Sequence, residues 1–180
     1  MVPTSLLEAL HEHFGPPRRE RDVVIEYRPE GPWLRTWNDS TAWITLEERC
    51  QSDRLVYLFQ LAHELVHTLD PVPFGQASVL EGGAATYFQH WYIRERLPFD
   101  DERRSHWCKS EDPEYKPAQD LVASFLELDP SALRRLRDAG DTLSLDSAGT
   151  LIAFVPSLER PIADKLVQRF EDWRKTCGLV

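Results

Sequence analysis

The chain has 180 residues, of which 42% are hydrophobic and 28% charged, and its formal net charge is −9. This composition is typical of a folded globular protein and excludes an intrinsically disordered or collagen-like chain. The length favours one domain, with at most a small appended lobe. An acidic chain lacks the basic surface of a general nucleic-acid binder and is repelled by anionic membranes, so we expect neither partner.

Two features of the sequence bear on its cellular location. No stretch reaches the roughly 18 apolar residues of a membrane-spanning helix, and the first residues lack the basic start and apolar run of a secretory signal. The three cysteines, Cys50, Cys108 and Cys177, are odd in number and far apart, which indicates no disulfide framework. We therefore expect a cytoplasmic protein.

The N-terminal part predicts a short helix followed by strands. The helix is expected to run from a cap at Thr4 or Ser5 to His13, before Gly15. Residues 23–27 are rich in β-branched side chains and predict a strand.

The next two strands are expected to form a hairpin. Residues 33–37 and 41–46 flank Asn38-Asp39-Ser40, which is typical of a tight turn. Ala42, Ile44 and Leu46 would share one face of the second strand.

Two helices are expected next. From Asp53, a plausible cap, hydrophobic residues recur every three or four positions until Pro71. The second helix would begin at Ser78, with Glu81 three residues later as a capping box, and end near Arg96. The buried stripe of the first helix is expected to be Leu55, Leu58, Phe59, Ala62, Val66 and Leu69.

The C-terminal part reads as a helical lobe. Residues 99–116 are charged and contain prolines, so we expect a long loop there and a boundary between a core of residues 1–98 and a lobe of residues 99–180. The fold class expected is α+β: a small antiparallel-edged sheet packed on the helix of residues 53–69, with this lobe packed on the core. Helices are expected at residues 118–128, 131–138, 147–155 and 162–177.

One motif carries chemistry: His63-Glu64-Leu65-Val66-His67, which has the pattern His-Glu-x-x-His. Residues four apart lie on one face of a helix, so both imidazoles can reach one zinc ion. Glu64 lies beside that face, where its carboxylate can accept a proton from a metal-bound water. The alternative is a pair of histidines on an amphipathic helix with no metal at all.

A hydrolytic zinc site usually has three protein ligands, and Glu81 is the candidate for the third. The turn after His67 would bring the next helix back along the first, and the small residues after Glu81 would let the two helices approach closely. The alternative is that Glu81 is only the carboxylate of the capping box. Other candidates are less well placed by sequence: Asp70, His90, Glu95 and His106.

Supporting groups have several candidates. Asp70 either accepts a hydrogen bond from the far nitrogen of His67 or is simply solvated at the helix end. Tyr87, His106 and Tyr115 are candidates for the donor that stabilises the oxyanion formed in the reaction.

His63-Glu64-x-x-His67 followed by Glu81-Gly82-x-Ala84 resembles the gluzincin branch of the zincin metallopeptidases, including the ImmA/IrrE-like peptidases and other minimal gluzincins. The resemblance covers about residues 41–88. It implies that His63, His67 and Glu81 hold one zinc ion and that Glu64 is the general base. It also implies that the strand of residues 41–46 is the sheet edge along which an extended peptide lies.

We therefore expect a zinc-dependent metallopeptidase whose partner is a peptide or protein substrate. The alternative is a non-catalytic regulatory or binding protein on a zincin scaffold. Retention of Glu64 argues against that alternative, because a purely structural zinc site needs no general base. The sequence does not indicate an oligomeric state.

Overall fold

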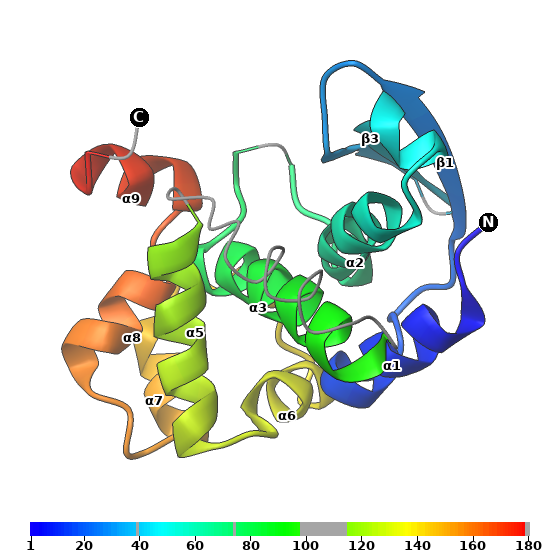
Figure 1. The fold of residues 1–180 in the computed structure, drawn as a ribbon. Helices are drawn as coiled ribbons and strands as arrows, with labels where there is room; N and C mark the ends of the chain where they lie inside the picture. The colour runs from blue at the N-terminus through cyan, green and yellow to red at the C-terminus, as the bar shows by residue number, and fades with distance from the viewer. Residues whose placement is uncertain (39, 74, 98–114, 179–180) are drawn as a thin grey trace.

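The computed structural model describes residues 1–38, 40–73, 75–97 and 115–178, and these form an α+β fold, as predicted (Figure 1). The described part contains a three-stranded sheet, one short 3-10 helix and eight α-helices. In chain order the elements are α1 (Thr4–Phe14), β1 (Asp22–Arg28), β2 (Trp33–Trp37), β3 (Thr41–Glu47), η1 (Glu48–Gln51), α2 (Arg54–Leu69), α3 (Val79–Arg96), α5 (Lys116–Leu128), α6 (Ala132–Asp138), α7 (Ala148–Phe154), α8 (Arg160–Leu166) and α9 (Phe170–Thr176).

The sheet is mixed and has the strand order β1-β3-β2. β2 and β3 form the predicted antiparallel hairpin, in which the Asn38 side chain accepts hydrogen bonds from the backbone of Ser40 and Thr41. β1 joins the other side of β3 in parallel, with Asp22 opposite Thr41. The expectation that residues 41–46 form a sheet edge is therefore wrong, because β3 is the central strand and has neighbours on both sides.

The sheet packs on α2 through the face predicted from its alternation. Ala42, Ile44 and Leu46 are fully buried, and α2 lies against β3 and β2 (Figure 1). Asp53 caps α2 as predicted, because its carboxylate accepts hydrogen bonds from the backbone N–H groups of Leu55 and Val56. α2 is thus fixed at its start and along one side.

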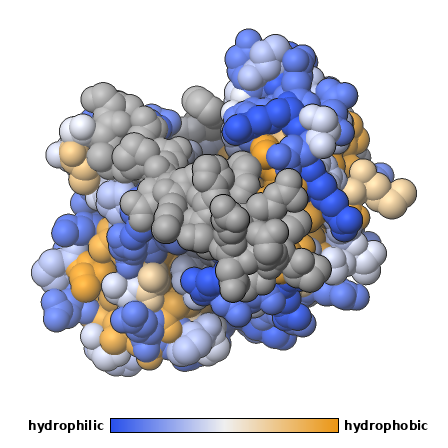
Figure 2. All heavy atoms as spheres, in the orientation of Figure 1, coloured by the Kyte–Doolittle hydropathy of each residue, from blue (hydrophilic) through white to orange (hydrophobic). Residues whose placement is uncertain are grey.

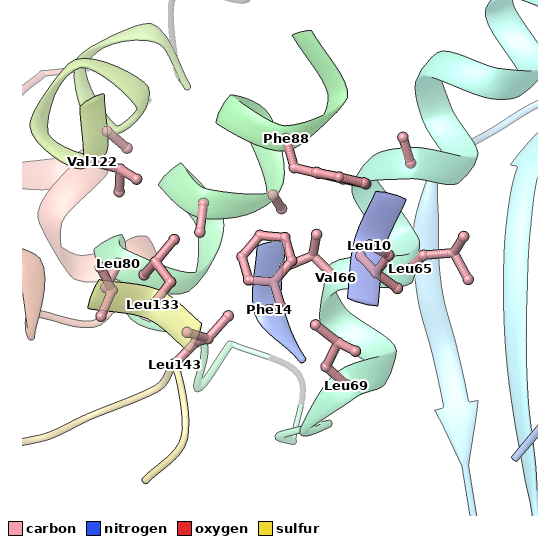
Figure 3. Packing of buried hydrophobic residues seen from close by; sticks show 14 of the residues in the cluster. Leu10, Phe14, Leu65, Val66, Leu69, Leu80, Phe88, Val122, Leu133 and Leu143 are labelled. Carbon is pink, nitrogen blue, oxygen red and sulfur yellow. The ribbon is translucent and has the colours of Figure 1, made fainter. Parts of the chain in front are cut away.

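The predicted stripe of α2 is buried at every position except Phe59, which is only partly buried. Figure 3 shows Val66 and Leu69 of α2 beside Phe14 of α1, with Leu80 and Phe88 of α3 nearby. One hydrophobic cluster contains these side chains together with others from α5 to α9. The C-terminal helices therefore pack on the N-terminal part, while the boundary predicted at residue 98 falls at the start of a segment outside the described residues.

The first helix starts differently from the prediction. Its N-cap is Pro3, and no side chain of α1 caps it. Proline is well suited to a helix start because its fixed φ angle costs nothing there and its missing N–H needs no partner.

Gly82 and Gly83 were expected to let α3 approach α2 closely, but they lie against other helices. A Cβ atom on Gly83 would lie 2.5 Å from the backbone oxygen of Ala118 in α5, and one on Gly82 would lie 3.1 Å from the ring of Phe170 in α9. These glycines therefore allow α5 and α9 to pack closely against α3. The residues that need the space left by the missing side chains belong to α5 and α9, and not to α2.

The helix predicted over residues 162–177 is interrupted in the structure, which has α8 and α9 instead. Between them Arg169 pairs with Ser78 as an antiparallel β-bridge, and the Phe170 N–H donates to the Ala77 carbonyl at 2.8 Å. The Val79 N–H donates to the Gln168 carbonyl at 2.9 Å. Tertiary hydrogen bonds to the start of α3 thus prevail over the local helical pattern.

Hydrophilic side chains cover much of the described surface on the face drawn in Figure 2, and hydrophobic side chains occur there in small groups. Among the described residues, every helix is too short or too polar to cross a lipid bilayer.

Candidate metal centre

The two imidazoles of the motif meet above one face of α2. His63 and His67 are one turn apart, and their Nε2 atoms are 3.3 Å apart. Two nitrogens that each lie 2.0–2.1 Å from a tetrahedral zinc ion are separated by about 3.3–3.4 Å. The spacing of the two Nε2 atoms therefore fits a shared zinc ion.

Helix α3 supplies a hydrogen-bond partner to each ring. The Glu81 Oε1 atom lies 2.6 Å from Nδ1 of His67, on the side of the ring away from His63. The side chain of Gln89 hydrogen-bonds His63. The order of these contacts shows that α2 and α3 run in opposite directions, because the later histidine meets the earlier residue of α3. Such partners fix the orientation of histidine rings at metal sites.

A hydrogen-bond network holds the Glu81 carboxylate from the C-terminal lobe. Ser144, in the segment after α6, donates from Oγ to Oε2 of Glu81 and accepts a hydrogen bond from the Ser78 N–H at 3.1 Å. The Ser78 side chain caps α3 by accepting from the Glu81 N–H and donates to the Leu143 carbonyl. Only half of the predicted capping box forms, because the Glu81 carboxylate binds His67 and Ser144.

Burial and neighbouring charge shift the pKa values of the two histidines in opposite directions. Burial, followed by the neighbouring His67, lowers the pKa of His63 well below 6.5. Burial also lowers the pKa of His67, but the hydrogen bond and charge of Glu81 and the charge of Glu64 outweigh this effect and raise it above 6.5. A histidine binds a metal through a ring nitrogen that carries no proton. His63 is neutral and can bind in this way, whereas His67, whose Nδ1 atom contacts Glu81, can do so once it has lost its second proton.

Glu64 occupies a very different environment from Glu81. Both residues are 3% exposed, but burial raises the pKa of Glu64 to about 7, although His67 and a hydrogen bond to the Leu34 backbone lower it in part. A carboxyl whose pKa lies near neutral pH can both accept and return a proton under physiological conditions.

Two cavities adjoin at His63 and Glu64. The larger is about 450 Å³ and lies among α2, α3, η1 and the start of α5; the smaller is about 150 Å³ and lies among β2, the segment before α3, and α9. Their walls share four residues: Pro32, His63, Glu64 and Tyr115. Glu64 therefore faces space on both sides that a substrate can occupy.

Tyr115, rather than Tyr87, lies at this junction. The Tyr115 ring packs edge-to-face on His63 with centroids 5.4 Å apart and stacks on Phe170 at 4.8 Å. Tyr87 is absent from the described walls of both cavities, so the structure does not bring this predicted candidate to the site.

Asp70 lies at the end of α2 and has other partners. Its carboxylate pairs with Arg137 at 2.8 Å and with Arg18 at 3.3 Å. The buried Arg137 guanidinium also donates to the backbone carbonyls of Phe14 and Gly15. Asp70 therefore anchors α6 and the end of α1, and this replaces its predicted role beside His67.

The remaining candidates for a third ligand differ in position. His90 lines the larger cavity and packs on Phe59, and burial together with Arg94 and Lys116 lowers its pKa to about 4. Glu95 is exposed and pairs with Arg94. His106 lies outside the described residues, as does Cys108.

The structure brings together His63, Glu64, His67 and Glu81, all four members of the predicted site. It does so with the Glu81 carboxylate on Nδ1 of His67, and the described residues contain no group of three histidine, cysteine or carboxylate side chains arranged to hold one metal ion. Direct coordination by Glu81 therefore stays a prediction. Sequence reasoning missed Ser144 and Gln89, since neither belongs to a spacing pattern with the histidines.

No family model, no curated protein sequence and no solved structure matches this chain.

Proposed function

We propose that this protein is a zinc-dependent metallopeptidase, in which a buried glutamate activates water for attack on a peptide bond. The observation that supports this proposal most strongly is the pair of Nε2 atoms 3.3 Å apart with Glu64 in the wall of both adjoining cavities. Zinc bound to this pair would polarise the peptide carbonyl and lower the pKa of a water molecule towards about 7.

In the proposed reaction Glu64 takes the proton from the attacking water and passes it to the amine that leaves. Its pKa of about 7 suits both transfers, because neither protonation state is strongly disfavoured at neutral pH. Tyr115, beside His63 and in both cavity walls, is our candidate for the donor that stabilises the oxyanion. No other tyrosine lines either cavity within the part of the chain that the structure describes.

Glu81 supports the site in one of two ways. It is either the third zinc ligand, as the resemblance to gluzincins implies, or the carboxylate that orients His67 through Nδ1, as the 2.6 Å contact favours. In both cases truncation of the side chain to alanine weakens zinc binding.

β2, rather than β3, is the strand that we propose to align an extended substrate. β2 is an edge of the sheet, and its residues Trp33 and Leu34 line the smaller cavity beside the histidine pair. Among the described strands β2 has a neighbour on one side only, as strand addition requires, and its Leu34 backbone hydrogen-bonds Glu64.

The test is hydrolysis of an unfolded protein such as casein by chain reconstituted with one equivalent of zinc. We expect fragments that appear with zinc, disappear with a chelator and return when zinc is restored. Failure to bind zinc would contradict the proposal. So would a zinc-loaded protein that cleaves no substrate, which would favour a non-catalytic binding or regulatory protein on this scaffold. The cytoplasmic location stays a prediction in either case.

A further inference from the structure

The two cavities that meet at Glu64 differ in size and in the chemistry of their walls. Both are bounded by the same four residues at their junction, so an extended chain that passes Glu64 enters one cavity on each side. The residues before and after the bond that is cleaved therefore meet different surroundings.

The smaller cavity is mainly apolar away from the histidine pair. At about 150 Å³ it matches the size of an apolar cavity that holds a benzene molecule. Such a space accommodates one aliphatic or phenyl side chain. Its apolar wall includes Trp33, Leu34, Val72, Pro73, Ala77 and Phe170. Glu171, whose carboxylate lies 4.0 Å from the Arg174 guanidinium, is the acidic residue of this wall away from the histidine pair.

Phe170 and Ala77 set the size of this cavity from two sides. The Phe170 ring is 6% exposed and fixed between Gly82 and Tyr115, and the backbone N–H of Phe170 is bound to the Ala77 carbonyl. A ring held between two neighbours, on a backbone bound to Ala77, forms a well-defined wall, and a substitution there changes the cavity volume directly.

The larger cavity has a polar wall, and the two basic side chains among its described residues are paired. Arg49 pairs with Glu47, and Lys116 pairs with Asp120. The other polar groups facing this space include the amides of Gln60, Gln89 and Gln119 and the hydroxyl of Thr86.

Amide and hydroxyl groups hydrogen-bond an uncharged polar side chain well. A charged side chain would have to lose water, and the described charged residues of this wall other than Glu64 already have partners. His90, in the same wall, is neutral at pH 7 because its pKa is about 4. At about 450 Å³ the cavity has room for more than one substrate residue.

We infer that the site selects peptides with one aliphatic or phenyl side chain on one side of the cleaved bond and uncharged polar residues, such as glutamine, asparagine, serine or threonine, on the other. This inference rests on the proposed peptidase function and names its substrate class. The two cavity walls act as independent selectors, so each preference can be changed without the other.

The test is a peptide library with every residue type at each position, digested by the zinc-loaded protein and read by mass spectrometry of the cleavage sites. Glu64→Gln is the blank that identifies cleavage by contaminants. We expect the favoured pair to be cleaved about tenfold or more faster than peptides with tryptophan or a charged residue at the same positions, a typical discrimination for one pocket.

Two variants change the small cavity in opposite directions. Phe170→Ala enlarges it and should admit tryptophan, while Ala77→Leu fills it and should restrict cleavage to alanine or smaller side chains. Lys175→Ala on the exposed face of α9 is the matched control and should keep the wild-type preference. Because Ala77 is only partly buried, its variant stays informative if Phe170→Ala fails to fold.

A third variant, Gln119→Leu, addresses the large cavity. It should shift the polar preference towards apolar residues and leave the aliphatic preference unchanged. Cleavage without preference at either position, or variants that leave the preferences as they are, would overturn the inference while leaving the peptidase proposal standing. Absence of any cleavage by zinc-loaded protein would overturn both.

Discussion

The two buried glutamates beside the histidine pair illustrate how one small region of a protein can make two opposite environments. Glu64 and Glu81 are equally buried, and each lies close to His67. Glu81 is bound at both oxygens, by His67 and Ser144, whereas Glu64 faces two cavities and has its pKa raised to about 7.

The difference teaches that burial alone does not decide what a carboxylate does. Its contacts with His67 and Ser144 fix the position of the Glu81 carboxylate beside His67, which suits a ligand or an orienting group. Burial, only partly offset by His67 and the Leu34 backbone, raises the pKa of Glu64 to about 7, which suits a group that exchanges a proton with water.

The largest effect is expected for Glu64→Gln. The amide cannot accept a proton from water, so peptide hydrolysis should fall by a hundredfold or more. Zinc stoichiometry and affinity should stay close to those of the wild type, because Glu64 is not a ligand in this account. Hydrolysis assays and metal titration on the same preparation check both statements, and a parallel loss of zinc would show that Glu64 has been misassigned.

The raised pKa of Glu64 predicts a pH dependence of stability in the metal-free protein. The unfolded chain releases the proton near pH 4.5 and the folded chain near 7, so the folded state loses stability as the pH rises through this range. The loss attributable to this carboxyl is about 3 kcal/mol.

Glu64→Gln cannot titrate and should lack this decline. Denaturant unfolding between pH 4 and 8 gives the free energy of unfolding of the wild type and of the variant. Subtracting one curve from the other removes the contribution of the other titrating groups. Parallel curves for the two proteins would contradict the raised pKa.

Glu81 tests the other half of the comparison. Glu81→Ala should weaken zinc binding about 10–100-fold even if Glu81 only orients His67, and more if it is a ligand. Glu81→Gln distinguishes the two roles, since its amide oxygen can still accept from Nδ1 of His67 but is a poor zinc ligand. Competition titration with a chromogenic chelator gives the affinities. Unchanged affinity in Glu81→Ala would leave Glu81 with no role at the metal.

The smallest effect is expected at Ser144, which acts through Glu81. Ser144→Ala should weaken zinc binding less than Glu81→Ala, by less than about tenfold, because it removes one hydrogen bond to a charged group. Ser144→Thr keeps the hydroxyl and should restore the affinity. The visible spectrum of the Co²⁺-substituted protein reports on the ligand geometry, and identical spectra and affinities for the alanine and threonine variants would show that the contact does not matter.

Much of α2 and the hairpin could be predicted because short-range signals specify them. The Asp53 cap, the three-to-four spacing of apolar residues and the turn at Asn38 each act within a few residues of the chain. The approach of Glu81 to the histidines was also expected, since a short turn leaves α3 few ways to pack.

The features that escaped prediction depend on contacts between distant segments. The parallel pairing of β1 with β3 makes β3 central, although the hairpin alone leaves either strand as an edge. The break between α8 and α9 comes from the pairing of Arg169 with Ser78, and Ser144 reaches Glu81 from a segment with no pattern of its own. No local propensity encodes such contacts.

The measurement that tests the central claim most directly is the zinc content of the purified chain, determined by elemental analysis alongside His63→Ala and His67→Ala. The account predicts one zinc ion per wild-type chain and a large loss in both variants, because the two Nε2 atoms hold the ion together. A folded wild-type protein that contains no zinc and takes up none on titration, or one whose zinc survives both substitutions, would contradict it.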